Sequence, residues 1–149
     1  MGCACTIERV LERLDDGRMN ILVRGTRPFR LLERQDELPY PAGTVEFLAD
    51  EQEQLDEQAA GGARELYRDL VQQATDRSLT AGELGELDAY GMAATVEFGV
   101  DAKQQLLELR SENARLGLLK LLLKAAIKRL ELLERAEERA RSNGKIRFG

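Results

Sequence analysis

An aromatic residue lies among several arginines in the segment MNILVRGTRPFRLLERQ, residues 19–35. The cluster consists of Arg24, Arg27, Phe29, Arg30 and Arg34. Guanidinium groups beside an aromatic ring can bind phosphate, or RNA through charge and base stacking. The acidic residues that could neutralise them across neighbouring strands are Glu8, Glu12, Glu33 and Glu37. We therefore favour paired surface charge, and keep Arg24, Arg27 and Arg30 as the candidate residues of an alternative RNA site.

Nucleophilic catalysis has few candidate residues in this chain. Histidine is absent, which excludes Ser-His-Asp and Cys-His nucleophile systems and removes the commonest metal ligand. The cysteines are Cys3 and Cys5, and two thiols cannot complete a tetrahedral zinc site without further ligands. Spaced i, i+2 along a strand, they share a face but form a poor pair for a structural disulfide. We expect free thiols, buried or partly buried, in a reducing compartment.

The serines also favour a structural role over a catalytic one. They are Ser78, Ser111 and Ser142, and each stands at the end of a predicted helix. A hydroxyl at such a position satisfies backbone groups, so helix capping is favoured over a Ser-Lys catalytic pair. The chain also lacks a glycine-rich loop with the spacing of a phosphate-binding motif. We predict a protein that is not an enzyme, with no catalytic residues, no metal and no cofactor.

The first third of the chain has the patterns of β-strands. Asp16-Gly17 predicts a tight turn between ACTIERVLERL and RMNILVRG. The apolar face predicted for the second of these segments consists of Met19, Ile21 and Val23. We expect Gly25 to end that strand, and Pro28 to restrict the following strand to a sheet edge or to its beginning. A further strand is expected over residues 44–48, after the Pro-Tyr-Pro sequence.

The rest of the chain is predicted to be a connector followed by helices. Residues 49–62 are rich in acidic residues, Gln and Ala and end in two glycines, so we expect a solvated connector with room for a little helix. One helix is expected over residues 63–77. Thr80 with Glu83 forms a capping box for a second helix, which should run to about Phe98. Asp101 is expected to cap a short third helix.

A long helix from Glu112 to about Asn143, capped by Ser111, is expected to close the chain. Its apolar stripe consists of Leu116, Leu119, Leu123, Ala126, Leu130 and Leu133, broadened over the first half by Leu118, Leu121 and Leu122. The breadth of this face favours packing within the chain over a coiled-coil dimer. The predicted organisation is a β-rich part over 1–48, a connector over 49–62 and a helical bundle over 63–149.

Composition and charge limit the classes of protein to which the chain can belong. A chain of 149 residues with 43% hydrophobic and 33% charged residues is typical of a globular domain. The net charge of −5 argues against a nucleic-acid partner. The first residues do not have the pattern of a signal peptide. The apolar segment 116–133 is interrupted by lysines, so no membrane span is predicted and a cytoplasmic location is expected.

Several of these segments, taken in order, resemble one known family. The segment VLERLDDGRMNILVRGTRPFRLLE is similar to the strand, turn and strand order in the N-terminal, substrate-binding domain of Lon proteases. The matching positions are Gly17, Ile21, Val23, Gly25, Arg27, Phe29 and Arg30. PYPAGTVEFL resembles the family's next strand, and LLELRSENARLGLLKLLLKAAIKRLELLE resembles its closing helices.

The resemblance implies an α+β fold, with a small β-rich, PUA-like half followed by a helical bundle with a long C-terminal helix. It implies a non-catalytic module that recognises unfolded or tagged polypeptides, or another protein, as the Lon domain does for its ATPase and protease domains. The expected binding surface is apolar and lies between the two halves, with Phe29, Tyr40 and Phe47 as candidate residues. Core packing is the competing explanation for these three aromatic side chains.

The resemblance also has a gap, because the family's first, Leu-Pro-rich strands have no counterpart before Cys3. We therefore expect either a fragment or a shortened version of the domain, whose β-barrel is open, with unpaired backbone groups along one edge. A second chain, a second copy in a homodimer, or an extended peptide is expected to pair with that edge. An RNA-binding PUA-like module and a structural dimerisation module stay open as alternative functions.

Overall fold

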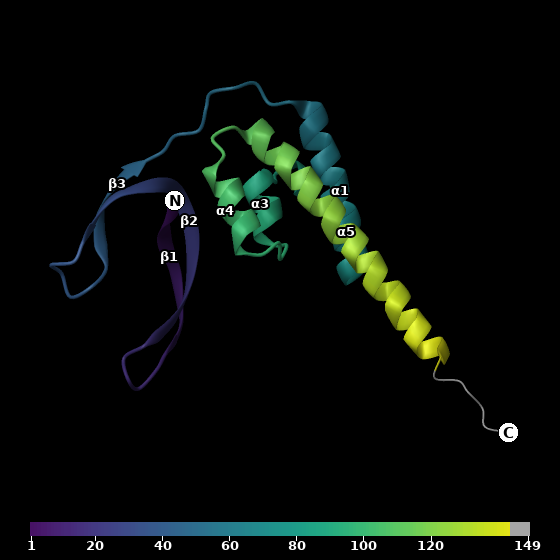
Figure 1. Ribbon diagram of the computed structural model, residues 1–149, viewed down its shortest axis with the longest axis horizontal. Helices are drawn as coiled ribbons and strands as arrows, with labels where there is room; N and C mark the ends of the chain where they lie inside the picture. Colours follow the sequence, from purple (N-terminus) through teal and green to yellow (C-terminus); the bar gives the residue numbers. More distant parts are fainter. Residues whose placement is uncertain (144–149) are drawn as a thin grey trace. The chain divides into compact units, whose positions relative to one another are not determined.

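The computed structural model describes residues 1–143, in which a three-stranded antiparallel sheet precedes a set of helices that ends in a long one (Figure 1). This α+β order of elements is the one predicted. Contacts divide the chain into Met1–Glu51, here called the strand unit, and a helical unit that begins at Gln52. The end of the predicted bundle, residues 144–149, and the side chain of Ser142 lie outside the described part.

The strand unit is a sheet with the order β1-β2-β3. Its strands are β1 (Gly2–Arg13), β2 (Met19–Gln35) and β3 (Ala42–Phe47). The turn predicted at Asp16-Gly17 connects β1 to β2, and Gly17 takes the positive φ of 85° that favours glycine. The Gly17 N–H donates to the Leu14 carbonyl at 3.0 Å. Because β2 is central, β1 and β3 are the two edges of the sheet in the described chain.

The strand break predicted at Gly25 is wrong, because β2 runs without interruption from Met19 to Gln35. The register between β1 and β2 shifts at this point, so that β2 holds an extra residue, Thr26, between the partners of Ala4 and Cys5. The Thr26 hydroxyl donates to the Ala4 carbonyl at 2.9 Å. A β-bulge thus absorbs the irregularity that the glycine signalled.

Pro28 was expected at a sheet edge or at the start of a strand, and it lies instead inside the central strand. Its position is still one where the missing N–H is tolerated. Pro28 is opposite Cys3 near the end of the β1 pairing, and β3 begins to pair with β2 at Phe29. The Pro28 carbonyl accepts a hydrogen bond from the Leu48 N–H at 3.0 Å, just beyond β3.

The first helix, α1 (Glu57–Thr75), starts earlier than expected and includes both glycines of the predicted connector. The helix starts earlier because an N-cap residue lies within the segment whose composition predicted a solvated connector. The Asp56 carboxylate accepts hydrogen bonds from the N–H groups of Gln58 and Ala59, each at 3.0 Å. Ala60 and Ala63 are buried on the face that packs against the last helix.

The single helix predicted from Thr80 to Phe98 is replaced by α2 (Ala81–Gly85) and α3 (Ala89–Ala94). The capping box of Thr80 and Glu83 is confirmed at the start of α2. The chain then breaks because Asp88 caps a new helix, its carboxylate accepting from the Gly91 N–H at 2.7 Å. Short polar side chains that compete for backbone N–H groups end one helix and begin the next.

The N-cap predicted at Asp101 is wrong, because helix α4 (Val100–Glu108) begins after Gly99. Gly99 has a φ of 83°, which a residue with a side chain rarely adopts. Asp101 lies in the first turn of α4, where a carboxylate is favourable next to the positive end of the helix dipole.

The long helix α5 (Glu112–Asn143) is confirmed, including its Ser111 cap, whose hydroxyl accepts from the Ala114 N–H at 3.0 Å. Its leucine stripe packs within the chain, chiefly against α1, and Leu116, Leu119 and Leu123 are almost fully buried. The stripe is narrower than predicted, since Leu121 is 66% exposed. The polar second half carries i, i+4 ion pairs such as Arg135–Glu131 at 3.6 Å.

Candidate functional site

The strand unit contains no buried residue, and every side chain of the buried core belongs to the helical unit. The large hydrophobic side chains that the strand unit exposes are Met1, Ile7, Val10, Leu11, Met19, Ile21, Leu22, Val23, Leu31, Leu32, Leu38, Tyr40 and Phe47. A globular protein rarely leaves so many apolar side chains in contact with water without a function for them. This unit is therefore the part of the chain where a binding surface is to be sought.

Two of the three aromatic residues predicted to bind polypeptides lie next to each other on this sheet. Phe29 of β2 and Phe47 of β3 are cross-strand partners, and their rings form a T-shaped pair with centroids 6.3 Å apart. The adjacent cross-strand pair on the same face is Leu31 and Val45. The Arg27 guanidinium lies over the Phe47 ring, 3.9 Å from its centroid. These five residues are here called the Phe47 cluster.

The third aromatic residue, Tyr40, lies apart from the Phe47 cluster. It belongs to the loop between β2 and β3, and its side chain is 60% exposed. A hollow of about 300 Å³ is lined by this loop and by the end of β2, from Arg34 to Pro41. Tyr40 thus lines a separate hollow. Nothing in its position along the sequence indicated that it would lie apart from Phe29 and Phe47.

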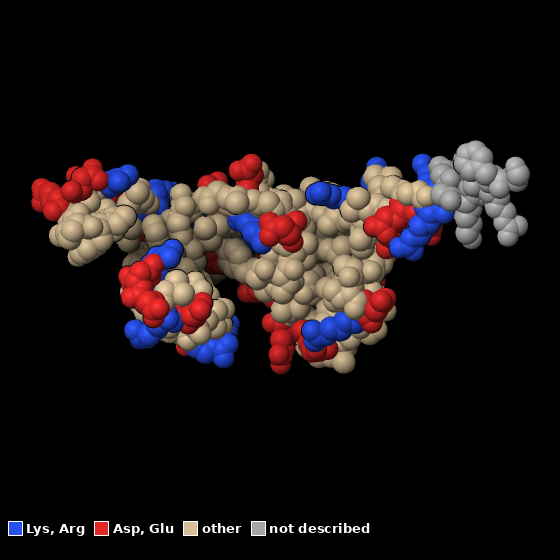
Figure 2. All heavy atoms as spheres, turned by 90° about the horizontal axis from the view of Figure 1, so that it is seen from below, with Lys and Arg blue, Asp and Glu red and all other residues tan. Residues whose placement is uncertain are grey.

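The predicted RNA-binding arginines are held by different partners. Arg24 pairs with Glu8, as the sequence favoured, and Arg30 pairs with Glu46 of β3 at 3.3 Å. Arg27 stacks on Phe47 instead of pairing with a carboxylate of the described chain. On the face drawn in Figure 2, Lys and Arg atoms lie beside Asp and Glu atoms and form no continuous basic patch.

Charge pairing at the sheet also differs from the prediction in its choice of acids. Glu33 and Glu37 were expected to neutralise the arginines, whereas Arg34 pairs with Asp36 at 2.8 Å. The side chains of Arg34 and Asp36 are both more than 70% exposed, so this ion pair is solvated. Solvated pairs of this kind stabilise a fold by about 0–1 kcal/mol at most.

The helical unit contains a second cavity, of about 180 Å³, near the starts of α1 and α5. The residues that line it are Leu55, Ala60, Arg64, Gly85, Glu86, Leu87, Asp88, Glu112 and Leu116. Arg64 donates to the carbonyls of Gly85 and Leu87 at 3.3 and 3.4 Å, which fastens α1 to the segment between α2 and α3. Residues around this cavity thus make contacts that hold the helices of the bundle together.

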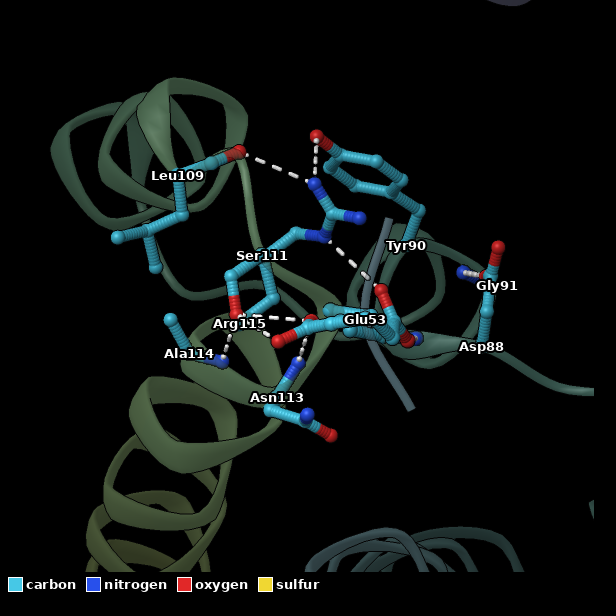
Figure 3. A network of polar contacts seen from close by, with 11 residues as sticks. Glu53, Asp88, Tyr90, Gly91, Leu109, Ser111, Asn113, Ala114 and Arg115 are labelled. Carbon is cyan, nitrogen blue, oxygen red and sulfur yellow. Dashed lines mark hydrogen bonds and ion pairs between the residues drawn. The ribbon is translucent and has the colours of Figure 1, made fainter. Parts of the chain in front are cut away.

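A network of polar contacts organises the beginning of α5 (Figure 3). The Glu53 carboxylate accepts from the Ser111 hydroxyl at 2.8 Å and from the Asn113 N–H at 3.0 Å. The Asn113 side chain in turn accepts from the Asp56 N–H and donates to the Gln54 carbonyl. The segment before α1 is thereby tied to the first turn of α5.

The centre of the same region is Arg115, a charged residue whose side chain is 3% exposed. Its guanidinium donates to Glu112 at 2.9 Å, to the Leu109 carbonyl at 3.0 Å and to the Tyr90 hydroxyl at 3.1 Å (Figure 3). Glu112 also accepts from the Ala89 N–H at 2.7 Å. This pair was not among the residues predicted to matter, although its i, i+3 spacing on a helix is a signal.

The pKa of Glu53 is lowered from its ordinary value of 4.5, first by the Asn113 N–H and then by the Ser111 hydroxyl. The folded protein thus favours the ionised carboxylate, so this contribution is present above the unfolded pKa and is lost as the pH falls through the lowered folded pKa. We expect Glu53→Gln to lower the melting temperature at pH 7, with a difference from the wild type that vanishes in acid. Circular dichroism melts across the pH range measure this.

Glu65→Gln is the matched control, since Glu65 is exposed on α1 and the substitution makes the same change in charge. Its melting temperature should follow that of the wild type at every pH. Equal curves for the Glu53 and Glu65 variants would contradict the role assigned to the Glu53 hydrogen bonds.

The other sites considered from the sequence have simple outcomes. Cys3 and Cys5 are free thiols, and Cys3 is partly buried as expected, whereas the expected burial is wrong for Cys5, which is exposed. Within residues 1–143, no group of three or more His, Cys, Asp or Glu side chains is arranged to hold a metal ion. In the same described range, no helix combines the length and the apolar composition needed to cross a bilayer.

Comparison with known proteins gives these surfaces a family context. Residues 1–125 match the model of the family described as the ATP-dependent protease La (LON) substrate-binding domain. A Lon protease of Anaeromyxobacter dehalogenans (strain 2CP-C) is 29% identical over 152 aligned residues, which cover 95% of this chain. The chain spans 17% of that relative's length, and the matched family model is not the catalytic part of the protease. The chain belongs to the Lon substrate-binding domain family.

Proposed function

We propose that this protein is a non-catalytic module that binds unfolded polypeptides, and that the strand unit is its binding surface. The Phe47 cluster, centred on Phe29 and Phe47, is the proposed centre of contact. Bound segments are extended, because an extended chain can lie across a sheet face or add a strand to an open edge.

The observation that carries the proposal is the absence of any buried residue from the strand unit, together with its exposed apolar side chains. A sheet of three strands needs an apolar face that is covered, since burial of apolar surface provides most of its stability. A bound polypeptide would cover such a face. Membership of a family described as substrate-binding supports the same function.

Binding of a permanently unfolded protein tests the proposal. A reduced and carboxymethylated α-lactalbumin, labelled with a fluorophore, is titrated with the full chain while its fluorescence anisotropy is followed. We expect saturable binding that changes little with added salt, because apolar contacts release few ions. Native α-lactalbumin with intact disulfides should not compete, since it buries the apolar residues that the sheet would contact.

The double variant Leu31→Thr and Phe47→Thr removes two apolar groups of the cluster while keeping residues that favour strands. We expect its dissociation constant to rise at least about tenfold, which corresponds to about 1.4 kcal/mol. Leu121→Thr removes a similarly exposed leucine from α5 and serves as the control, with unchanged binding expected. Equal affinities of wild type and double variant would contradict the proposed surface.

RNA binding is the second candidate function, carried by Arg24, Arg27 and Arg30. The pairing of Arg24 with Glu8 and of Arg30 with Glu46 gives it less support. Titration with homopolymer RNA at two salt concentrations separates the two functions, because phosphate contacts weaken steeply as salt is added. Binding of RNA but not of the unfolded protein would replace the proposal.

Self-association through a sheet edge is the third candidate. Both edges, β1 and β3, lack a second strand partner in the described chain. Sedimentation velocity over a range of protein concentrations distinguishes a homodimer from a monomer. A dimer that dissociates when unfolded polypeptide is added would place both partners at the same surface.

A further inference from the structure

The Phe47 cluster contains one charged residue, Arg27, and its surroundings differ from those of the other β2 arginines. Arg24, Arg30 and Arg34 each form an ion pair with a carboxylate of the strand unit. Arg27 is exposed and has no such pair within the described chain. Its guanidinium carbon instead lies over the Phe47 ring, 3.9 Å from the ring centroid.

Stacking on an aromatic ring prepares a guanidinium group to bind a carboxylate. The ring covers one side of the guanidinium group, and a ring forms no ion pair, so N–H donors of the group stay available for a carboxylate. Those donors match the two oxygens of a carboxylate and form short, charge-assisted hydrogen bonds. Contact with the Phe47 ring also limits the rotamers of Arg27, so less conformational entropy is lost when a ligand binds.

The charge around Arg27 favours one carboxylate over a nucleic-acid backbone. Neighbouring guanidinium groups at Arg24 and Arg30 are already neutralised by Glu8 and Glu46. A nucleic acid requires several cations in a row, and the chain as a whole carries a net charge of −5. A single acidic side chain requires only one available cation.

The register of the sheet sets the spacing of this ligand. Arg27 and Phe29 are two residues apart on β2, and their partners Ala4 and Gly2 are two residues apart on β1, in a part of the ladder without a register shift. They therefore lie on the same face, separated by about 7 Å along the strand. An extended ligand has the same period of two, so its acidic side chain should be two positions from an aromatic one.

We propose that Arg27, stacked on Phe47, is a specificity residue that selects polypeptide segments with a carboxylate two positions from an aromatic side chain. This inference rests on the proposed function, since it concerns the composition of the segments that the strand unit binds. It assigns Arg27 to the ligand carboxylate, and Phe29 with Leu31 to the ligand's apolar group.

Three labelled peptides that differ only in one acidic or amide residue and its distance from Phe test the inference. The protein used is the full chain. The first has Glu two positions from Phe, the second has Gln in place of that Glu, and the third has Glu next to Phe. All are acetylated and amidated, so that no terminal carboxylate is present. We expect the first peptide to bind about fivefold more tightly than the other two, the modest factor reflecting the exposure of Arg27.

Variants of the protein locate this preference. Arg27→Gln should bind all three peptides with the affinity that the wild type has for the Gln peptide. Phe47→Leu keeps an apolar side chain without a ring to stack on, and should lose most of the preference. Arg30→Gln is the matched control and should keep it. Circular dichroism establishes that each variant is folded.

Each remaining outcome is decisive. If the wild type binds the Glu and Gln peptides equally, the inference is overturned while the proposed function stands. If it binds no peptide and no unfolded protein, the proposed function fails as well. If homopolymer RNA binds and Arg27→Gln abolishes that binding, Arg27 serves a nucleic acid and the carboxylate assignment is wrong.

Discussion

Replacing Leu119 by alanine should destabilise the helical unit by about 2–5 kcal/mol. Leu119 is fully buried in the core, where α5 packs against α1. The substitution removes apolar atoms from this contact and leaves a cavity that the helices can close only in part. Urea unfolding followed by the helical circular dichroism signal measures the loss, and the midpoint should fall without a large change in slope.

The matched control is Leu121→Ala, the same substitution two residues along the same helix. Leu121 is 66% exposed, so little buried surface is lost, and alanine is the better helix former. We expect a change of less than about 0.5 kcal/mol. Similar losses for the two variants would mean that α5 does not pack on α1 through the face that contains Leu119.

Replacing Arg115 by methionine should cost about 3 kcal/mol, because a buried charge network loses its central cation. Methionine roughly preserves the aliphatic volume but leaves the Leu109 carbonyl and the Tyr90 hydroxyl without this donor. It also removes the partner of Glu112, whose side chain is 23% exposed and therefore only partly solvated. Chemical unfolding at neutral pH measures the difference.

A double-mutant cycle separates the ion pair from the other contacts of Arg115. Glu112→Gln keeps an acceptor for the Ala89 N–H while removing the charge. The coupling energy between the two substitutions should be about 1–3 kcal/mol. Arg68→Met removes an exposed pair with Asp69 and should change stability by less than about 0.5 kcal/mol. A loss for Arg115→Met no larger than this control would contradict the structural role of the network.

The features that the sequence predicted correctly are local ones. The Asp16-Gly17 turn, the Thr80–Glu83 capping box and the Ser111 cap each depend on side chains within a few residues of the backbone groups they satisfy. The length of α5 follows from a continuous run of good helix formers. Such features are encoded within one turn or one cap, so they do not depend on what packs against them.

The errors arose where a local signal was overruled by a contact with another element. Gly25 lies within β2 because pairing with β1 holds the strand extended and a bulge takes up the extra residue. Pro28 is tolerated in the central strand because the pairing changes from β1 to β3 beside it. Asp56 starts α1 earlier than the glycines indicated, since its capping bonds and the packing on α5 outweigh their low helix propensity.

The candidate functional site, too, depends on contacts between elements that the sequence alone did not predict. Its aromatic residues were visible in the sequence, but their grouping was not. Register places Phe47 opposite Phe29 and leaves Tyr40 in a loop. Glu46 becomes the partner of Arg30 because the two are opposed across strands, although Glu33 is nearer in sequence.

By itself, the sequence determined the α+β order, the long last helix, the absence of histidine chemistry and the resemblance to the Lon substrate-binding family. The first three properties follow from composition, periodicity and side chains that act on nearby backbone groups, and the resemblance follows from the order of several segments along the chain. Only the tertiary structure decided which arginines are neutralised, which aromatic rings meet, and that the strand unit buries no side chain. Those properties depend on distances between residues far apart in the chain, which strand register and helix packing alone define.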